Sequence, residues 1–198
     1  MNYDSTIMKT NFRLANFFSK KYGVCTNSFN SCIITALNCL NLSNKYILVN
    51  SEKIYYILKK TNYQPVFVNY KDYKFDIDDF LKKVKKLKSY CLILSHNNGN
   101  IDTDKILYHC IKHNIFIIDD YKKVYNKNVK MIGELSCFSL EEGSLLCAQE
   151  GGLIITDISR FYEKLINLVG YVDKKEIYNY SFRISKLQCN YLLQNLDK

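Results

Sequence analysis

The sequence contains one proline, seven glycines, three arginines and no tryptophan among its 198 residues. So little proline and glycine excludes a collagen-like or low-complexity chain, in which these residues dominate. No run approaches the roughly 20 consecutive apolar residues that a membrane-spanning helix needs. The first residues also lack the basic start and apolar stretch of a secretory signal. We therefore expect a soluble, cytoplasmic protein.

A net charge of +9 suggests nucleic acid as a partner, but the scarcity of arginine weakens this interpretation. Basic surfaces bind phosphates through counterion release. However, only Arg13, Arg160 and Arg183 can make the bidentate contacts of sequence-specific readers. The densest basic run alternates with apolar residues and predicts the solvated face of a helix; its lysines are Lys82, Lys83, Lys85, Lys86 and Lys88. We do not expect nucleic acid as a partner, although a basic binding module stays a third functional class.

Eight cysteines are present, and none forms a CxxC pair. Cys91 and Cys137 lie inside apolar runs, as expected of free thiols in a reducing compartment. Cys25, Cys32 and Cys39 recur at intervals of seven residues, which predicts one helix face because free cysteine packs as a small hydrophobe.

Short apolar runs alternate with helical patterns along the chain. The runs cover residues 46–50, 65–69, 91–95, 115–119 and 152–156. Continuous apolar runs of this length are typical of strands covered on both faces. Asp76 is placed to cap one intervening helix, and Asp102 or Thr103 another. With no polar linker in sight, we predict one α/β domain over residues 1–198, in which helices flank a mostly parallel sheet in three layers.

Ligands of such sheets gather beyond the carboxyl ends of the strands. Asp119 and Asp120 end a buried strand, where an unpaired carboxylate is costly. A ligand or a nearby lysine, Lys122 or Lys123, can meet that charge, and the local pattern does not decide. Gly151–Gly152 before the last apolar run fits either a hairpin-like turn or a close backbone approach to a ligand.

His109 and His113 stand one helical turn apart, with Cys110 beside the first. They can share a helix face, as metal ligands do. No third ligand follows at a suitable spacing, so we expect no metal site.

Seven segments of the chain are similar to motifs of one known protein family. They follow one another in the same order and at the same distances, which is hard to obtain by chance. They are FFSKKYGV at 17–24, YQPVFVNYKDYKFDID at 63–78, SHNNGNIDTDKI at 95–106, IIDDYKKV at 117–124, GELSCFSL at 133–140, QEGGLIIT at 149–156 and SFRISKLQC at 181–189. From about Phe12 onward, the chain resembles the DegT/StrS nucleotide-sugar aminotransferases, a branch of the fold-type I pyridoxal-phosphate enzymes. FFSKKYGV is similar to the entry helix of that family. The resemblance implies the large domain of that fold, and since the chain ends at Lys198, we expect the small carboxyl-terminal domain to be missing.

The resemblance implies roles for single residues. Asp120 would pair with the pyridinium nitrogen of the cofactor, and Ser139 would bind its phosphate. Asn30 and Ser31 belong to the phosphate-binding segment, and Ser181 completes the implied cofactor-binding set. The cofactor would be pyridoxal phosphate or pyridoxamine phosphate.

The family's Schiff-base lysine follows the phosphate-binding serine by five residues, which leads to Ser144. Counting back six residues from Glu150 leads to Ser144 again. A hydroxyl cannot form the bond that an amine forms with the cofactor aldehyde.

Other departures from the family pattern also indicate that the cofactor site is compromised. Phe29 replaces a glycine of the phosphate-binding segment, and Lys123 replaces a glutamine and can neutralise Asp120. The segment that supplies a stacking aromatic ring is shortened near Asn50 and Ser51.

Besides a nucleic-acid-binding module, two other functions are therefore considered. The first, which we favour, is a degenerate relative without transaminase activity that dimerises with itself or with an intact aminotransferase. The alternative is an active sugar-modifying enzyme, an aminotransferase or dehydratase, acting on a nucleotide sugar. It would bind the cofactor noncovalently or use Lys123 as a displaced base.

Overall fold

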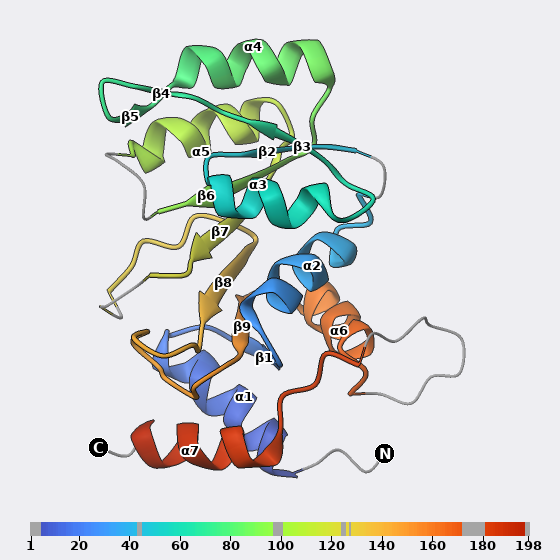
Figure 1. Ribbon diagram of the computed structural model, residues 1–198, viewed down its shortest axis with the longest axis vertical. Helices are drawn as coiled ribbons and strands as arrows, with labels where there is room; N and C mark the ends of the chain where they lie inside the picture. The colour runs from blue at the N-terminus through green and yellow to red at the C-terminus, as the bar shows by residue number, and fades with distance from the viewer. Residues whose placement is uncertain are drawn as a thin grey trace. The chain divides into compact units, whose positions relative to one another are not determined.

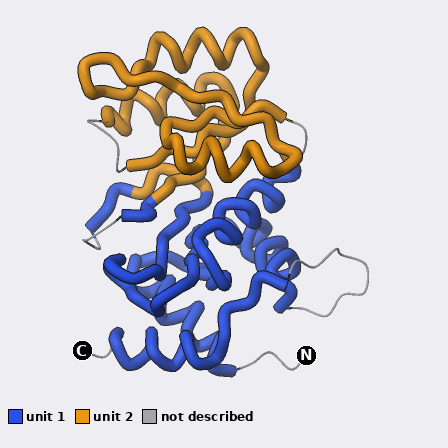
Figure 2. Tube along the Cα trace, in the orientation of Figure 1, with its two compact units in different colours: residues 1–41, 121–130, 135–198 blue, residues 42–120, 131–134 orange. Residues whose placement is uncertain are grey.

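The computed structural model describes residues 5–42, 45–96, 101–123, 126, 128–171 and 181–196. Part of the SHNNGNIDTDKI segment, residues 97–100, lies outside this range. The chain forms two compact units (Figure 2). Unit 1 comprises Met1–Asn41, Tyr121–Lys130 and Leu135–Lys198, and unit 2 comprises Leu42–Asp120 and Met131–Glu134. Neither unit is a continuous segment, and a single domain over residues 1–198 stays a prediction.

Unit 2 contains the parallel strands that the apolar runs predict. They are β2 (Tyr46–Val49), β3 (Gln64–Phe67), β6 (Cys91–Ser95) and β7 (Phe116–Tyr121). Their order is β7-β6-β2-β3, and every neighbouring pair among them is parallel. A small hairpin of β4 (Tyr70–Lys71) and β5 (Lys74–Phe75) was not predicted from the sequence.

Helices cover both faces of this parallel sheet (Figure 1). The helices are α3 (Glu52–Lys59), α4 (Ile77–Leu87) and α5 (Thr103–Lys112). Phe80 of α4 and Ile106 of α5 join the core that also contains Leu48 and Leu92 of the strands. On the other face, α3 packs against β2 and β3.

The two predicted helix caps in unit 2 are confirmed. The Asp76 carboxylate accepts a hydrogen bond from the Asp79 N–H at 2.9 Å. The Asp102 carboxylate accepts one from the Lys105 N–H at 3.1 Å. Each bond satisfies an N–H group that the first helical turn leaves without a partner.

Unit 1 contains three antiparallel strands, in the order β1-β9-β8. They are β1 (Tyr22–Thr26), β8 (Leu135–Ser139) and β9 (Gly152–Thr156). The helices are α1 (Ser5–Phe17), α2 (Phe29–Cys39), α6 (Ser159–Leu168) and α7 (Lys186–Leu196). Helix α2 packs against β8 and β9, and α1 packs against α7. None of the helices in the described ranges is long and apolar enough to cross a membrane.

Two predictions in this unit are wrong. Of the segment at 17–24, only Phe17 is helical, because Ser19 adopts a left-handed backbone (φ 55°) and β1 begins at Tyr22. The three evenly spaced cysteines do not share a helix, since Cys25 lies in β1 and only Cys32 and Cys39 lie in α2. A seven-residue interval indicates a common face only within one helix.

Candidate functional site

Glu141, two residues after the end of β8, binds both serines that mark the predicted site on this loop. Its N–H donates to Ser139 Oγ at 3.1 Å. Its carbonyl accepts from the Ser144 N–H at 3.1 Å and also from the Ser144 hydroxyl. Gly143, between them, has a positive φ of 79°, a conformation that glycine adopts without strain. Ser139 and Ser144 are therefore held around a single residue.

The Glu141 side chain forms an ion pair with Lys122. Lys122 Nζ lies 2.8 Å from one carboxylate oxygen and 3.1 Å from the other. The same ammonium lies 5.0 Å from the centre of the Phe29 ring, which is fully buried. The Lys122 side chain is 15% exposed and the Glu141 side chain 39%, so water reaches the carboxylate and screens the pair in part. The amine bonded within this cluster is Lys122, whereas Lys123, the predicted catalytic lysine, is exposed.

Two serine hydroxyl groups stabilise the first turn of α2. Ser28 caps the helix: its Oγ accepts from the Ser31 N–H at 3.1 Å and lies 2.8 Å from Ser31 Oγ. Ser31 is buried, whereas Asn30 is exposed.

Strand β9 passes very close to this helix start. A Cβ atom on Gly152 would lie 2.6 Å from the Cys32 Cβ and 2.8 Å from the Ser28 carbonyl oxygen. Gly152 is also the register partner of Ser139 in the β8–β9 pair. Gly151 and Gly152 therefore stand at the start of an antiparallel strand. The close backbone approach that Gly152 allows is to helix α2 of the same chain. Ser139 and the start of α2 therefore belong to one site in unit 1.

The segment that begins at Ser181 runs beside Asn27, just before α2. The Asn27 N–H donates to the Phe182 carbonyl at 2.8 Å, and the Asn27 amide donates to the Ser181 carbonyl at 3.4 Å. Ser181 itself is exposed. Unit 1 thus brings Ser139, Ser144 and Ser31 to this region, and it connects Ser181 through its backbone.

In unit 2, the buried carboxylate of Asp119 is satisfied within the chain. One oxygen lies 2.8 Å from His96 Nε2. The other accepts from the N–H groups of Ile132 at 3.0 Å and Gly133 at 2.8 Å. Sequence reasoning offered a ligand or a lysine for this charge and missed the histidine, although His96 directly follows the neighbouring strand.

Asp120, the predicted partner of the cofactor ring, is also buried. Its backbone carbonyl accepts a hydrogen bond from the His96 N–H at 3.2 Å. Neutralisation of its carboxylate by Lys123 stays a prediction.

Asn50 and Ser51, where the aromatic segment is shortened, are both buried. The Asn50 side chain accepts from the Ser95 N–H at 2.7 Å and donates to the Ser95 carbonyl at 3.0 Å. It also donates to the Tyr70 hydroxyl at 2.8 Å. Asn50 therefore ties the carboxyl ends of β2 and β6 together.

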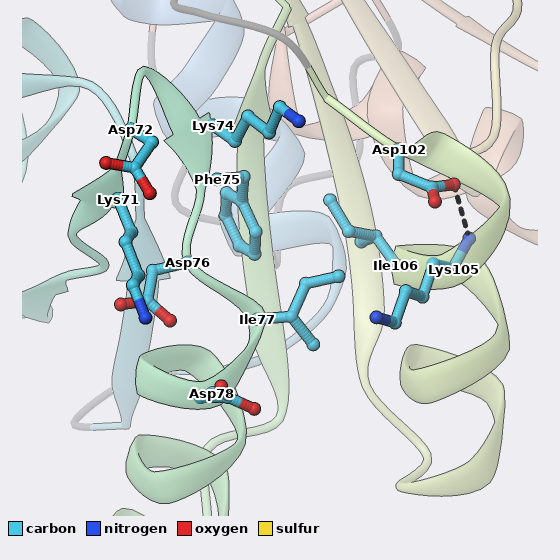
Figure 3. Close-up of a pocket in the computed structure, with 10 residues that line it drawn as sticks. All are labelled: Lys71, Asp72, Lys74, Phe75, Asp76, Ile77, Asp78, Asp102, Lys105 and Ile106. Atoms are coloured by element: carbon cyan, nitrogen blue, oxygen red, sulfur yellow. Dashed lines mark hydrogen bonds between the residues drawn. The ribbon is translucent and has the colours of Figure 1, made fainter.

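A separate hollow of about 630 Å³ opens in unit 2, at the starts of α4 and α5 (Figure 3). Phe75, Ile77 and Ile106 lie between its charged side chains. Those side chains are Lys71, Asp72, Lys74, Asp76, Asp78, Asp102 and Lys105. Because three lysines and four aspartates line it, the hollow carries charges of both signs and its lining does not single out an anion or a cation as ligand.

His109 lies in α5, and His113 is the residue that caps the carboxyl end of this helix. Cys110, between them in sequence, is buried in the core. Within the residues that the structure describes, no three His, Cys, Asp or Glu side chains are grouped so as to hold a metal ion.

The sequence pattern of the DegT/DnrJ/EryC1/StrS aminotransferase family matches residues 6–198. The chain belongs to this family. A curated relative, named as an L-glutamine:3-amino-2,3-dideoxy-scyllo-inosose aminotransferase of Micromonospora echinospora, is 23% identical over 121 residues. That match covers 54% of this chain and 29% of the relative.

Several solved structures share the fold. DesI, solved in the presence of its TDP-sugar product, superposes with a TM-score of 0.84 at 17% identity and covers 99% of this chain. PseC of Helicobacter pylori gives 0.82 at 19% identity over 98% of this chain. DesV of S. venezuelae gives 0.84 at 19% identity over 97% of this chain. The chain spans 53%, 58% and 57% of those structures, respectively, about half of their length. The predicted fold class, a mostly parallel sheet flanked by helices, is confirmed.

Sequence reasoning missed Lys122 and Glu141 as members of the site. IIDDYKKV at 117–124 resembles a DegT-family segment that reads V-I-E-D-A-A-Q-A, and Lys122 stands where that segment has its second alanine. A lysine in place of a small residue directly after a strand was the available signal. Glu141 carried no comparable signal, because its role depends on a turn that brings Ser144 back toward Ser139.

Proposed function

We propose that this chain is a member of the DegT family without transaminase activity. The proposal rests on the hydrogen bonds that Ser144 forms. At the position where the resemblance expects a lysine, a hydroxyl donates to the Glu141 carbonyl and closes a local turn. A hydroxyl is too weakly basic, and too poor a nucleophile toward an aldehyde, to replace that amine.

The other residues of the site do not fit pyridoxal phosphate either. A phosphate cup built from backbone N–H groups needs a residue without a side chain at its closest point. By the resemblance, Phe29 stands at that point, and its side chain is fully buried at the start of α2. The solved relatives include a Spr1654 protein of Streptococcus pneumoniae in both the pyridoxal-phosphate and the pyridoxamine-phosphate forms. With Ser144 in place of an amine and Phe29 in place of a glycine, this chain does not fit the cofactor of those structures.

The proposed role is structural or regulatory, through assembly with a second subunit. That subunit is either another copy of this chain or an intact aminotransferase of the same family. All eight cysteines lie in the described residues as free thiols, which agrees with the proposed cytoplasmic location. Light scattering after size-exclusion chromatography measures the assembly, first with the chain alone and then with an intact family member.

Activity is tested on the purified chain with pyridoxal phosphate, an amino donor and a keto nucleotide sugar. We expect no visible absorbance band of lysine-bound cofactor and no amino transfer, while an intact family member shows both. Amino transfer with such a band would refute the proposal. Turnover with added pyridoxamine phosphate but without the band would support the alternative, an enzyme that binds its cofactor noncovalently.

A further inference from the structure

Four hydrogen-bonding groups converge on Glu141, three on its backbone and one, the Lys122 ammonium, on its side chain. Ser139 accepts from its N–H, and Ser144 donates twice to its carbonyl. Its carboxylate contacts Lys122 Nζ through both oxygens. The backbone bonds fix the position from which the Glu141 side chain reaches Lys122, and the contact through both carboxylate oxygens gives the pair a defined geometry.

The Glu141 carboxylate places a negative charge where a phosphate group would approach Lys122. Lys122 alone would attract a phosphate group, as lysines in phosphate sites do. Glu141 neutralises that ammonium at 2.8 Å, and its own negative charge repels an incoming phosphate dianion. The Phe29 ring, whose centre lies 5.0 Å from the ammonium, adds a favourable cation–π contact.

The hydroxyl groups of the site already have partners inside the chain. Ser139 Oγ accepts from Glu141, and Ser28 Oγ bonds both the N–H and the Oγ of Ser31. A phosphate group that approached the Lys122 ammonium would have to displace the Glu141 carboxylate.

From these contacts, and resting on the proposed function, we infer that the Lys122–Glu141 ion pair packed on Phe29 closes this site to phosphate groups. The chain's own side chains take the role of the ligand. The site is thereby kept ordered without a cofactor.

The test is isothermal titration of the full chain with inorganic phosphate and, separately, with pyridoxamine phosphate. Glu141→Gln removes the competing charge and keeps the side-chain shape. Glu142→Gln makes the same charge change at the exposed neighbouring residue and serves as the matched control. Circular dichroism and thermal unfolding confirm that each variant is folded.

We expect the unaltered chain and Glu142→Gln to show no saturable binding of either probe. Glu141→Gln should bind at least one probe, at least tenfold more tightly than the unaltered chain. Adding Lys122→Met to Glu141→Gln should remove that binding. Saturable binding by the unaltered chain, or no binding by a folded Glu141→Gln variant, overturns the inference.

Failure of this inference differs from failure of the proposed function. Reversible binding of pyridoxamine phosphate to the unaltered chain, without amino transfer, would refute the closed site only. Amino transfer with a lysine-bound cofactor would refute the proposed function.

Discussion

His96 Nε2 lies 2.8 Å from a carboxylate oxygen of Asp119, a side chain that is completely buried. The second oxygen of Asp119 accepts two backbone N–H groups, from Ile132 and Gly133. Asp119 therefore joins the end of β7 to His96, which follows β6, and to the 131–134 segment of unit 2. A carboxylate with three internal partners serves as a structural anchor.

Asp119→Asn should destabilise the protein by about 2–4 kcal/mol, because the amide carries no charge and has one acceptor oxygen where the buried carboxylate offers two. The free energy of unfolding, measured in urea, checks this value. Asp78→Asn, at an exposed position in the first turn of α4, is the control and should cost about 0.5 kcal/mol or less. Equal losses in the two variants would show that Asp119 is not an anchor.

Gly152→Ala should cost about 3 kcal/mol, because the new Cβ would lie 2.6 Å from the Cys32 Cβ and 2.8 Å from the Ser28 carbonyl. Gly143→Ala separates crowding from backbone strain, since its Cβ would meet no atom within 4 Å although its φ is 79°. That control should cost about 1 kcal/mol. Urea unfolding of both variants measures the difference, and a Gly143→Ala loss as large as that of Gly152→Ala would contradict the close approach.

The buried thiols should make stability fall in alkaline solution. Burial raises the pKa of Cys39 and of Cys110 from 9.0 to about 12. The stabilisation is therefore complete below about pH 9 and is lost as the pH rises toward about 12, because the unfolded thiols release protons first.

Each of these thiols should contribute about 1.4 kcal/mol of lost stability per pH unit in that window. Replacing Cys39 and Cys110 together by alanine should make the decline between pH 9 and 11 shallower than in the unaltered chain. Cys147→Ala, at a half-buried thiol, provides the comparison for the loss of a cysteine as such. An unchanged slope in the double variant would refute the raised pKa values.

Accessibility predicts which cysteine reacts first in the native protein. Seven of the eight cysteines, all within the described residues, are buried, and Cys147 is half-buried. Iodoacetamide should alkylate Cys147 in the folded chain and the others only after unfolding, because the reagent needs an accessible thiolate. Peptide mass spectrometry measures the order, and equal labelling of Cys137 and Cys147 without denaturant would contradict the packing.

Restoring a lysine at residue 144 should not be sufficient to bind the cofactor. Ser144→Lys supplies the missing amine, but the Lys122–Glu141 pair and Phe29 stay in place. We expect an absorbance band of lysine-bound pyridoxal phosphate only when Ser144→Lys is combined with Glu141→Gln and Phe29→Gly. A strong band in Ser144→Lys alone would show that the site is open.

The strands of unit 2 could be predicted because a strand covered on both faces needs a continuous apolar run, as in Cys91–Ser95. The caps at Asp76 and Asp102 could be predicted because capping is local. The β4–β5 hairpin could not, because its strands are two residues long. Nor could the His96–Asp119 and Lys122–Glu141 contacts, since each joins residues about 20 positions apart through the packing of the chain.

Borohydride reduction of the chain with pyridoxal phosphate, followed by peptide mass spectrometry, tests most directly whether a lysine of the site holds the cofactor. Borohydride makes any lysine–cofactor bond permanent, so the modified residue can be read from the peptides. Our account predicts no stoichiometric adduct on Lys122, on Lys123 or elsewhere, whereas an intact family member is labelled at its lysine. A stoichiometric adduct on Lys122 or Lys123 would contradict the claim that this chain has lost its transamination chemistry.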